Sequence, residues 1–537
     1  MNKLTFWRLL PFAVLLVFTA PLIIVISSLF GEYSENWSHL FEFVLIDYIS
    51  SSLYLVIGVS LLVFIIGTVT AWTVTSYNFT GKRIFEWALI LPLSIPPYIL
   101  AYTFTGLFDH YGDANNLVRF LFDLENSSIF FPNVRNIYGA IIVFAFTLYP
   151  YVYLVSRSAF INQSRSMKES ARILGLNQYQ VFYKLALPLI RPAAIGGLML
   201  VIMETLSDFG AVDHFAIQTF TTGIFRTWYG LYDIQTAMQL ASLLLITVGV
   251  FYLIERQSRG EGIYTSKNST YSPNQQESLK GYKALIAFLI CFTPIFIGFI
   301  LPIIELLLWA FEVNLEFFSN KFIENSINTL TLSLVTGFVC ASLALLINFS
   351  IRFTPNELIL RLSYLLSIGY AVPGLILAVG MVQLMVFLDA NVFLGFEFVL
   401  TGSLFGLILA YIIKTYALAN SSIESGYERL SHALDDSAKL LGSSGFRMLK
   451  NVHIPLLKTS ILTSVLLVMS DVVKELPATL ILRPFNFETL AVSTYTYASE
   501  ERMLQAAAPA IAIVLIGLIP IVFLSKMIRS SRPVEEK

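Results

Sequence analysis

Long runs of uncharged residues constrain this chain more than any other feature. A membrane-spanning helix needs about 20 mostly apolar residues, because the hydrocarbon core is about 30 Å thick and each helical residue rises about 1.5 Å. Ten runs without a charged side chain are long enough to be spans: 9–31, 48–81, 87–108, 136–156, 234–254, 284–304, 325–351, 362–388, 398–413 and 503–525. Two shorter runs, 192–203 and 459–470, each end at a carboxylate. Counting these two as spans predicts an all-α integral membrane protein of twelve transmembrane helices.

The composition excludes a water-facing globule of this size. Only 13% of the residues are charged and 56% are hydrophobic, whereas a soluble domain averages about 25% charged residues. The 34 Lys and Arg residues nearly balance 35 Asp and Glu residues, so nothing points to nucleic acid as a partner. Cys291 and Cys340 lie far apart in apolar runs and offer neither a disulfide framework nor a CxxC site. The lipid bilayer is therefore the first partner that the sequence predicts.

Basic residues predict the orientation of the spans. With the N-terminus in the cytoplasm, 27 of the 34 Lys and Arg residues fall in cytoplasmic segments, among them those of 157–191, 255–283 and 414–458. Cytoplasmic loops of membrane proteins carry such an excess of Lys and Arg. Because twelve spans bring both termini to the same side, both termini are expected in the cytoplasm.

The chain repeats itself once. ESARILG at 169–175 matches DSAKLLG at 436–442 at an offset of 267 residues, and Glu204 and Asp471 keep this offset. The polar segment 255–282, rich in Ser, Asn and Gln, is typical of a linker. Each copy has six spans and begins on the same side, so the two repeats are parallel. The predicted organisation is a first six-helix half at 1–254, a cytoplasmic linker at 255–282 and a second six-helix half at 283–537.

Each half contains a cytoplasmic loop, at 160–188 and 425–455, that is too polar to span a membrane and too apolar to be disordered. Ser431 is at a position where it can cap the N-terminus of a short helix. Gly175 and Gly442 are at positions where a residue of left-handed conformation would end such a helix at its C-terminus. The periodicity alone leaves two alternatives open. The short helices either lie on the membrane or their own bundle, or dock a soluble partner.

The spacing in these loops, Glu-x-Ala-x3-Gly followed by a hydrophobic stretch and Pro, resembles the EAA loop of permease subunits of binding-protein-dependent ABC importers. Its positions are Glu169, Ala171, Gly175 and Pro188 in the first copy, and Asp436, Ala438, Gly442 and Pro455 in the second. Both copies have Ser at the middle position of the motif, and the second has Asp in place of Glu. The resemblance implies a type I ABC importer permease of MetI-like fold, whose two loops are coupling helices.

The same resemblance implies partners and location. Each of two copies of an ABC ATPase would bind one coupling helix, and an extracytoplasmic binding protein would deliver the substrate. The chain would cross a bacterial cytoplasmic membrane. The sequence contains no GxxxxGK[ST] phosphate loop. ATP and Mg²⁺ are therefore expected on the ATPase subunits, and this chain is expected to be no enzyme and to bind no cofactor.

Residues 203–230 and 471–495 look like the ferric-iron permeases of the FbpB/SfuB type, which implies ferric iron as the substrate. Thiamine, sulfate, polyamines and phosphonates are alternatives within the same importer class. A secondary transporter driven by an ion gradient also fits twelve spans in two halves, but it does not explain the duplicated loops. A membrane-embedded enzyme is a third alternative, but the sequence shows no catalytic grouping of His, Cys or carboxylate residues outside the fifth and eleventh spans.

Charged residues interrupt the fifth and eleventh spans: Glu204, Asp208, Asp471, Lys474 and Glu475. A charge at the bilayer centre costs about 2.5–3.5 kcal/mol on insertion scales, so these residues are expected to face protein or water. One hypothesis is that the two carboxylate pairs, each spaced four residues apart on one helix face, line a translocation path for a hard trivalent cation. The alternative is that they cap the outer ends of their helices and hold neighbouring helices together.

The remaining polar residues suggest no metal site, because the five histidines are divided between the two sides of the membrane. A cluster of tyrosines near the inner end of the fourth span is interpreted as an interfacial aromatic belt: Tyr149, Tyr151 and Tyr153. Prolines in the third span, such as Pro96, and Pro373 in the ninth predict kinks or unwound turns at matching positions of the two halves.

Overall fold

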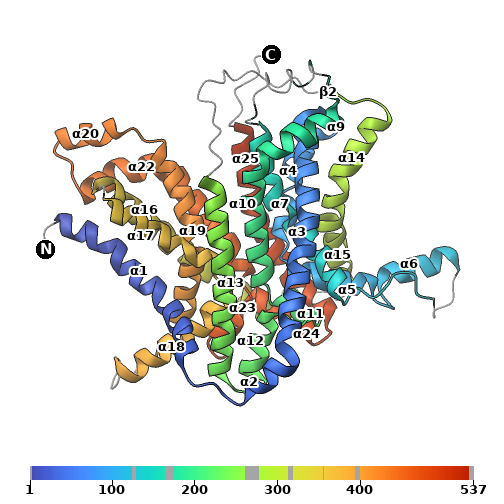
Figure 1. The fold of residues 1–537 in the computed structure, drawn as a ribbon, viewed down its shortest axis with the longest axis horizontal. Coiled ribbons are helices and arrows are strands. Elements are labelled where there is room, and N and C mark those ends of the chain that lie inside the picture. The colour runs from blue at the N-terminus through green and yellow to red at the C-terminus, as the bar shows by residue number, and fades with distance from the viewer. Residues whose placement is uncertain are drawn as a thin grey trace.

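The structure is a computed structural model that describes residues 3–123, 128–161, 163, 171, 173, 175–260, 277–312, 319–354, 356–392 and 399–530. The described part is almost entirely helical (Figure 1). Within it, 11 helices are long and apolar enough to cross a membrane, or 12 if one bent pair counts as a single span. With the bent pair counted, this number agrees with the twelve predicted spans.

The helices and strands of the first half are α1 (Lys3–Ser27), α2 (Asn36–His39), α3 (Leu45–Ser76), β1 (Tyr77–Asn78), α4 (Lys82–Ala88), α5 (Pro97–Phe108), α6 (Asp113–Phe122), α7 (Ile137–Ile161), α9 (Gln178–Val181), α10 (Leu187–Ser207), α11 (Gly210–His214), α12 (Phe220–Tyr229) and α13 (Ile234–Gly260). Its 3-10 turns are η1 (Ser28–Phe30) and η3 (Leu91–Ser94), and its π-helical turns are η2 (Leu40–Val44) and η4 (Phe182–Ala186).

Those of the second half are β2 (Glu277–Ser278), α14 (Tyr282–Ile295), α15 (Leu301–Glu312), α16 (Asn320–Phe353), α17 (Glu357–Leu366), α18 (Gly374–Asn391), α19 (Leu404–Glu428), α20 (His432–Leu440), α21 (Phe446–Met448), α22 (Ile454–Lys474), α23 (Pro477–Leu482), α24 (Leu490–Ser499) and α25 (Met503–Ser530). Its π-helical turns are η5 (Phe296–Ile300) and η8 (Leu449–His453), and its 3-10 turn is η7 (Ser367–Ala371). The two short strands pair in parallel, with Tyr77 opposite Glu277.

Two predicted spans are broken by prolines. The predicted span 87–108 bends by 90° between 82–94 and 97–122, where Ile95 and Pro96 have extended backbone. The predicted span 362–388 is likewise not continuous, because α17 and η7 end before Pro373 and α18 begins after it. A proline has no N–H for the helix and clashes with the preceding turn. The breaks predicted at these prolines are thus confirmed in both halves.

The two halves repeat element by element. η4 and α10 occupy the same positions as η8 and α22 at the 267-residue offset, and α5 and α18 begin 277 residues apart. The predicted linker overlaps α13, which continues to Gly260, and residues 261–276 lie outside the described ranges. The described parts of the two halves thus follow the offsets that the sequence comparison found.

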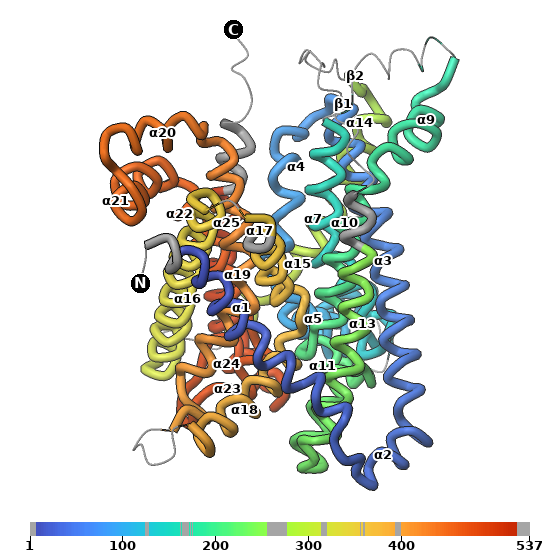
Figure 2. The backbone as a smooth tube through the Cα atoms, turned by 60° about the vertical axis from the view of Figure 1, so that its left-hand side comes forward, coloured from blue at the N-terminus to red at the C-terminus, as the bar shows by residue number. Residues whose placement is uncertain are grey.

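The first helices of the two halves are exchanged. α1 packs mainly on α16, α17 and α18 of the second half, while α14 packs on α3 and α4 of the first; α15 packs on α25 of its own half and also on α5 of the first. Figure 2 shows α1 (blue) crossing the second half on its way to α2. Trp7 of α1 is buried against the rings of Phe349, Phe353 and Phe446. Both large hydrophobic clusters consequently contain residues of both halves.

Candidate functional site

The long helices α10 and α22 end at matched positions where the two halves meet. α10 ends at Ser207 and α22 ends at Lys474, and the next residues, Asp208 and Glu475, have extended backbone. The short helices α11 and α23 follow after one more residue. Each half therefore places a polar turn, rather than a continuous helix, at this position.

Asp208 and Glu475 cap the short helices that follow them. Oδ1 of Asp208 accepts a hydrogen bond from the backbone N–H of Ala211 at 2.8 Å, and Oε1 of Glu475 accepts one from the N–H of Ala478 at 3.1 Å. A carboxylate there is stabilising because the first N–H groups of a helix have no intrahelical acceptor. The prediction that these residues share a helix face with the preceding carboxylates is wrong, because each long helix has already ended. The capping alternative describes them better, although they cap the next helix rather than their own.

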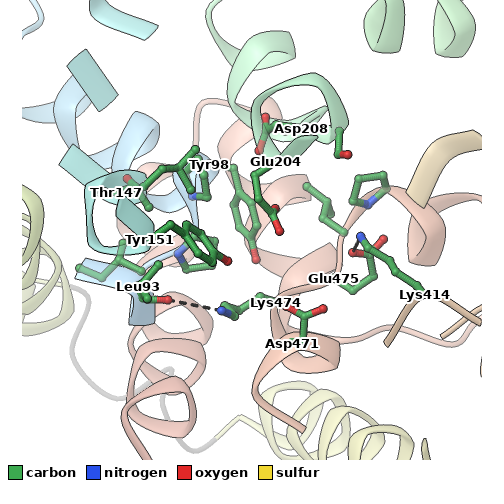
Figure 3. A pocket seen from close by; sticks show the side chains of 18 residues that line it. Leu93, Tyr98, Thr147, Tyr151, Glu204, Asp208, Lys414, Asp471, Lys474 and Glu475 are labelled. Carbon is green, nitrogen blue, oxygen red and sulfur yellow. Dashed lines mark hydrogen bonds and ion pairs between the residues drawn. The ribbon is translucent and has the colours of Figure 1, made fainter. Parts of the chain in front are cut away.

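A cavity lies between these turns, with about 750 Å³ of space between protein atoms, its open mouth included. All five charged residues singled out from the sequence line it, together with Lys414 (Figure 3). Its walls come from both halves: the full lining is Leu93, Ile95, Pro96, Pro97, Tyr98, Thr147, Leu148, Tyr151, Glu204, Ser207, Asp208, Gly210, Lys414, Asp471, Lys474, Glu475, Leu476 and Pro477. The structure thus brings the five residues together, while transport through the cavity stays a prediction.

Lys414 forms the closest ion pair of this site. Its Nζ lies 2.5 Å from Oε2 of Glu475, and both side chains are mostly buried. Gly374, at the start of α18, leaves room for the pair, because a Cβ atom there would contact the Glu475 carboxylate and lie 3.3 Å from Nζ of Lys414. The sequence placed Lys414 in a cytoplasmic segment, which is wrong because α19 continues past it to Glu428.

Two other charged groups of the cavity, Lys474 and Glu204, have uncharged hydrogen-bond partners. Lys474 donates to the backbone carbonyl of Leu93 at 3.3 Å, and Tyr370 donates to Oε1 of Glu204 at 3.2 Å. In Figure 3, Lys474 lies between Leu93 and Asp471. Throughout the described part of the chain, no three His, Cys, Asp or Glu side chains are grouped so that they could hold a metal ion. The cavity in this conformation is an acidic compartment that lysines partly neutralise.

Two phenol groups complete the cavity wall. Tyr98 and Tyr151 both line it, and the hydroxyl of Tyr98 has no hydrogen-bond partner among the described residues. Tyr149 and Tyr153, on either side of Tyr151, are fully buried, and Tyr153 donates to the carbonyl of Glu86 at 3.0 Å. The predicted interfacial belt is wrong, because α7 packs against α3, α5 and α10 within the bundle. The sequence did not predict Tyr98 as a cavity residue. The one feature that could have indicated it is its position directly after Pro96 and Pro97.

The second cytoplasmic loop forms the helix that its sequence predicts. The hydroxyl of Ser431 accepts a backbone hydrogen bond at 3.2 Å and caps α20, and Gly442, with φ of +77°, follows its C-terminal end. Asp436 is exposed on this helix. Leu440 and Leu441 at its end are 89% and 87% exposed. α20 therefore presents an acidic residue and an apolar tip away from the bundle.

The two copies of the EAA-like motif correspond where both are described. Ala171 and Ala438 are both buried, and Gly175, with φ of +82°, has the same left-handed conformation as Gly442. Glu169 lies outside the described residues. The two motif prolines stand in the first turns of the long helices: Pro188 in α10 and Pro455 in α22. Figure 2 shows α9 and α20, the short helices of the two loops, toward the same end of the molecule.

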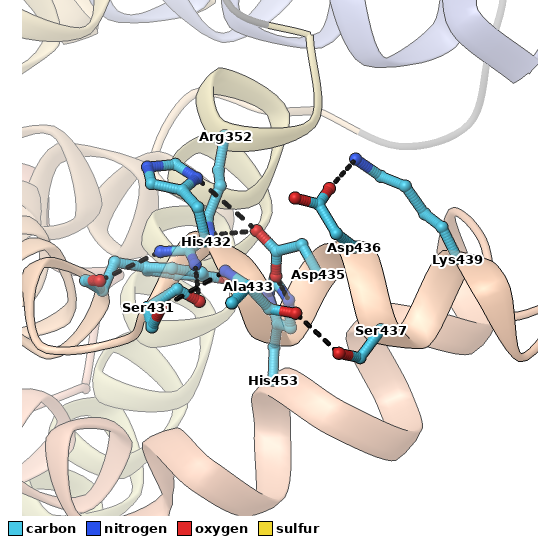
Figure 4. Close-up of polar contacts among 10 residues, drawn as sticks. Arg352, Ser431, His432, Ala433, Asp435, Asp436, Ser437, Lys439 and His453 are labelled. Atoms are coloured by element: carbon cyan, nitrogen blue, oxygen red, sulfur yellow. Dashed lines mark hydrogen bonds and ion pairs between the residues drawn. The ribbon is translucent and has the colours of Figure 1, made fainter.

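A buried ion network anchors α20 to the second half (Figure 4). Nε of Arg352, from α16, lies 2.6 Å from Oδ2 of Asp435, and Nε2 of His453 lies 3.0 Å from the other carboxylate oxygen. Arg352 also donates to the carbonyls of Tyr427 and Ser431. Burial raises the pKa of Asp435, but the hydrogen bond and charge of Arg352, together with His453, bring it below its usual value. Sequence reasoning missed this network because 83 positions separate Arg352 from Asp435.

Comparison with known proteins agrees with the duplicated architecture. Residues 63–256 and 333–530 each match the family of binding-protein-dependent transport system inner membrane components. The Fe(3+)-transport system permease protein FbpB 2 of Haemophilus influenzae is 26% identical over 493 residues, which cover 89% of this chain and 90% of that protein. The ferric transport system permease protein FbpB of Actinobacillus pleuropneumoniae is 22% identical over 397 residues, 70% of this chain and 56% of that protein.

A shorter match concerns a permease named for another substrate. The sulfate transport system permease protein CysT of Salmonella typhimurium is 28% identical over 148 residues, which cover 28% of this chain and 50% of that protein. The two family matches together cover well over half of the chain and include both EAA-like loops and both polar turns of the cavity. This multi-pass chain therefore belongs to the family of inner membrane components of binding-protein-dependent transport systems.

Proposed function

We propose that this chain is the permease subunit of an ATP-driven importer of ferric iron. The observation that carries the proposal is the cavity where the halves meet, which is bordered by four carboxylates at repeat-matched positions: Glu204, Asp208, Asp471 and Glu475. Carboxylate and phenol oxygens are the donors that a hard trivalent cation prefers. The names of the relatives that align over most of the chain support the same substrate.

The charge of the cavity argues against sulfate as the substrate. Four carboxylates face only two lysine ammonium groups there, so sulfate would enter a compartment that is formally negative. No feature of the cavity favours thiamine, polyamines or phosphonates over iron.

Energy is supplied by separate subunits in this proposal. Two copies of an ABC ATPase bind on the cytoplasmic side, one against α20 and one against the equivalent loop of the first half. Exposed apolar side chains at both loops suit such a contact: Leu440 and Leu441 in the second copy and Ile173 in the first. Buried side chains on the same loops, Ala171 and Ala438, join each loop to the bundle. The permease itself performs no bond-making chemistry, and ATP and Mg²⁺ belong to the partner subunits.

An extracytoplasmic binding protein delivers the iron on the opposite side. The positive-inside distribution of Lys and Arg supports a cytoplasmic position for both termini and both coupling loops. ATP binding brings the two ATPases together beneath the loops, and the two halves alternate the side to which the cavity opens. The break between α10 and α11, matched by that between α22 and α23, supplies polar turns around which the opening can change.

Uptake of radiolabelled ferric iron tests this function. Cells that express the chain with its ATPase and binding protein are expected to accumulate iron, and cells without the chain are not. A double variant, Gly175→Val with Gly442→Val, should abolish uptake, because a β-branched residue is strained at positive φ and would distort both loops.

Gly402→Val is the matched control for this variant. Gly402 also has positive φ, and like the two loop glycines its Cβ position meets no described atom within 4 Å, but it lies in the loop before α19 on the other side. It should leave uptake intact. Iron uptake that persists without the chain would refute the substrate. Uptake that needs the chain but ignores the double variant would refute the coupling role and favour a secondary transporter.

A further inference from the structure

Tyr98 presents an unused polar group to the cavity. Its side chain is 3% exposed, and its hydroxyl has no hydrogen-bond partner among the described residues. A buried hydroxyl without a hydrogen-bond partner costs free energy, so a ligand atom that pairs with it would be stabilising. In Figure 3, the phenols of Tyr98 and Tyr151 point toward the space between Glu204 and Lys474. The phenol of Tyr98 is thus an unpaired polar group in the cavity wall.

The charges in front of this hydroxyl are those of a partly neutralised cation site. Of the two lysines, Lys414 is occupied by its ion pair with Glu475. Lys474 instead donates to a neutral backbone carbonyl and lines the cavity with Glu204 and Asp471. The charges of both lysines act on these two carboxylates, but among the described residues Lys474 is the cavity lysine without a carboxylate partner. Lys474 is therefore the ammonium group whose place a bound cation would take.

We infer that the cavity is a transient binding site for the trivalent cation, with Tyr98, Glu204 and Asp471 as oxygen donors and Lys474 as a tethered cation that the cargo displaces. This inference rests on the proposed function and names the site at which the permease holds its substrate. Tyr370, which donates to Glu204, orients that carboxylate without ligating the cation. Because the donors come from α5, α10 and α22, the site is complete only where both halves meet.

The tethered lysine explains how an acidic site can release its cargo. Carboxylate and phenol oxygens alone would bind a trivalent cation tightly and trap it. The ammonium group of Lys474 is tethered close to Glu204 and Asp471, so its effective concentration at these carboxylates is high and it competes with the bound cation. Binding then stays weak enough for transport. Removal of this competitor should tighten binding and slow release, a combination that a purely structural lysine would not produce.

Terbium luminescence tests the site directly. Tb³⁺ is a hard trivalent cation whose emission is sensitised by a nearby tyrosine, and it can be titrated into the full chain in nanodiscs of neutral lipid. Tyr98→Phe should weaken Tb³⁺ affinity at least about tenfold, since loss of a metal-site partner typically costs 10–100-fold. The variant should fold normally, because the hydroxyl that it lacks has no partner among the described residues. Lys474→Met should tighten binding about tenfold.

Tyr149→Phe is the matched control. Tyr149 is fully buried, and its hydroxyl also lacks a partner within the described ranges, but it does not line the cavity. Equal Tb³⁺ affinities of Tyr98→Phe and Tyr149→Phe would overturn the site, as would unchanged or weaker binding by Lys474→Met. Iron uptake by the same variants separates the two proposals. If wild-type cells take up no iron while Tb³⁺ binding follows the expected pattern, the proposed substrate fails and the hard-cation site stands.

Discussion

Lys414 and Glu475 meet in the interior of the protein, with Nζ and Oε2 2.5 Å apart, although 61 positions separate them in the chain. α19 supplies the lysine, and the turn after α22 supplies the carboxylate. Each charge offsets the cost of burying the other, so the pair is stabilising only when both members are present.

Removal of one member of this pair is expected to destabilise the second half. Lys414→Met leaves the Glu475 carboxylate without its cation and should lower the free energy of unfolding by about 1–3 kcal/mol. Denaturant unfolding of the purified chain in detergent measures this change. The double variant Lys414→Met with Glu475→Gln should recover most of the loss. A single variant as stable as the wild type would show that the pair contributes nothing to stability.

Asp208 is expected to stabilise the fold by capping the N-terminus of α11. Asp208→Ala removes the acceptor for the N–H of Ala211 and should cost about 1 kcal/mol of stability, whereas Asp208→Asn keeps an acceptor and should cost little. Thermal unfolding of the two variants compares them. Equal losses in both would mean that the charge of Asp208, rather than its hydrogen bond, stabilises the turn.

Glu204 and Asp471 are expected to act in transport rather than in stability. The double variant Glu204→Gln with Asp471→Asn removes two negative charges from the cavity and should strongly reduce iron uptake while the ATPase subunits still assemble. Co-purification of the ATPase and iron uptake are measured on the same preparation. Asp208→Asn serves as the control for loss of one cavity charge with its cap retained. Normal uptake by the double variant would exclude these carboxylates from the path.

Asp435 is expected to make the anchoring of α20 depend on pH. Its pKa is lowered in the folded protein, so the unfolded state binds more protons near pH 4 and stability falls as the pH drops. The contribution of Asp435 should be fully present above the ordinary carboxyl pKa of about 3.9 and be lost as the pH falls through the lower folded value. The difference in melting temperature between wild type and Asp435→Asn should shrink as the pH falls from 7 to below the ordinary carboxyl pKa of about 3.9. A difference that grows toward acid would reverse the sign of the pKa shift.

The apolar tip of α20 is expected to matter for assembly alone. Leu440→Glu with Leu441→Glu should weaken ATPase binding, because both side chains are almost fully exposed and would place charge in an apolar contact. The melting temperature of the chain should not change, since neither side chain packs in the core. Co-purification of the ATPase measures the effect. A lowered melting temperature with intact assembly would contradict the docking role.

Several features were predictable because they depend on local physics. Charge-free runs located the spans, the proline positions located the two broken helices, and Ser431 and Gly442 located the ends of α20. Each of these signals acts within a few residues, where hydrogen-bond capacity and allowed φ values decide the backbone. Because the sequence repeats at an offset of 267 residues, the helix boundaries found in one half also predicted those of the other half.

The prediction failed where a residue's position depends on another span. Lys414 follows a charge-free run and resembles a cytoplasmic basic residue, but its helix continues and carries it into the cavity. Tyr149 resembles an interfacial aromatic residue, but neighbouring helices cover it completely. Hydropathy reports the average surroundings of a segment. It does not distinguish lipid from the interior of a helical bundle, because both are apolar.

The sequence by itself determined the class of this protein: its helices, their breaks, its internal repeat and the two motif-bearing loops. Tertiary structure alone decided which charges meet, because the matched endings of α10 and α22, together with α5, α7 and α19, bring distant residues to one cavity. The physical reason is that buried charges must find partners, and the available partners are set by packing between helices rather than by position in the chain.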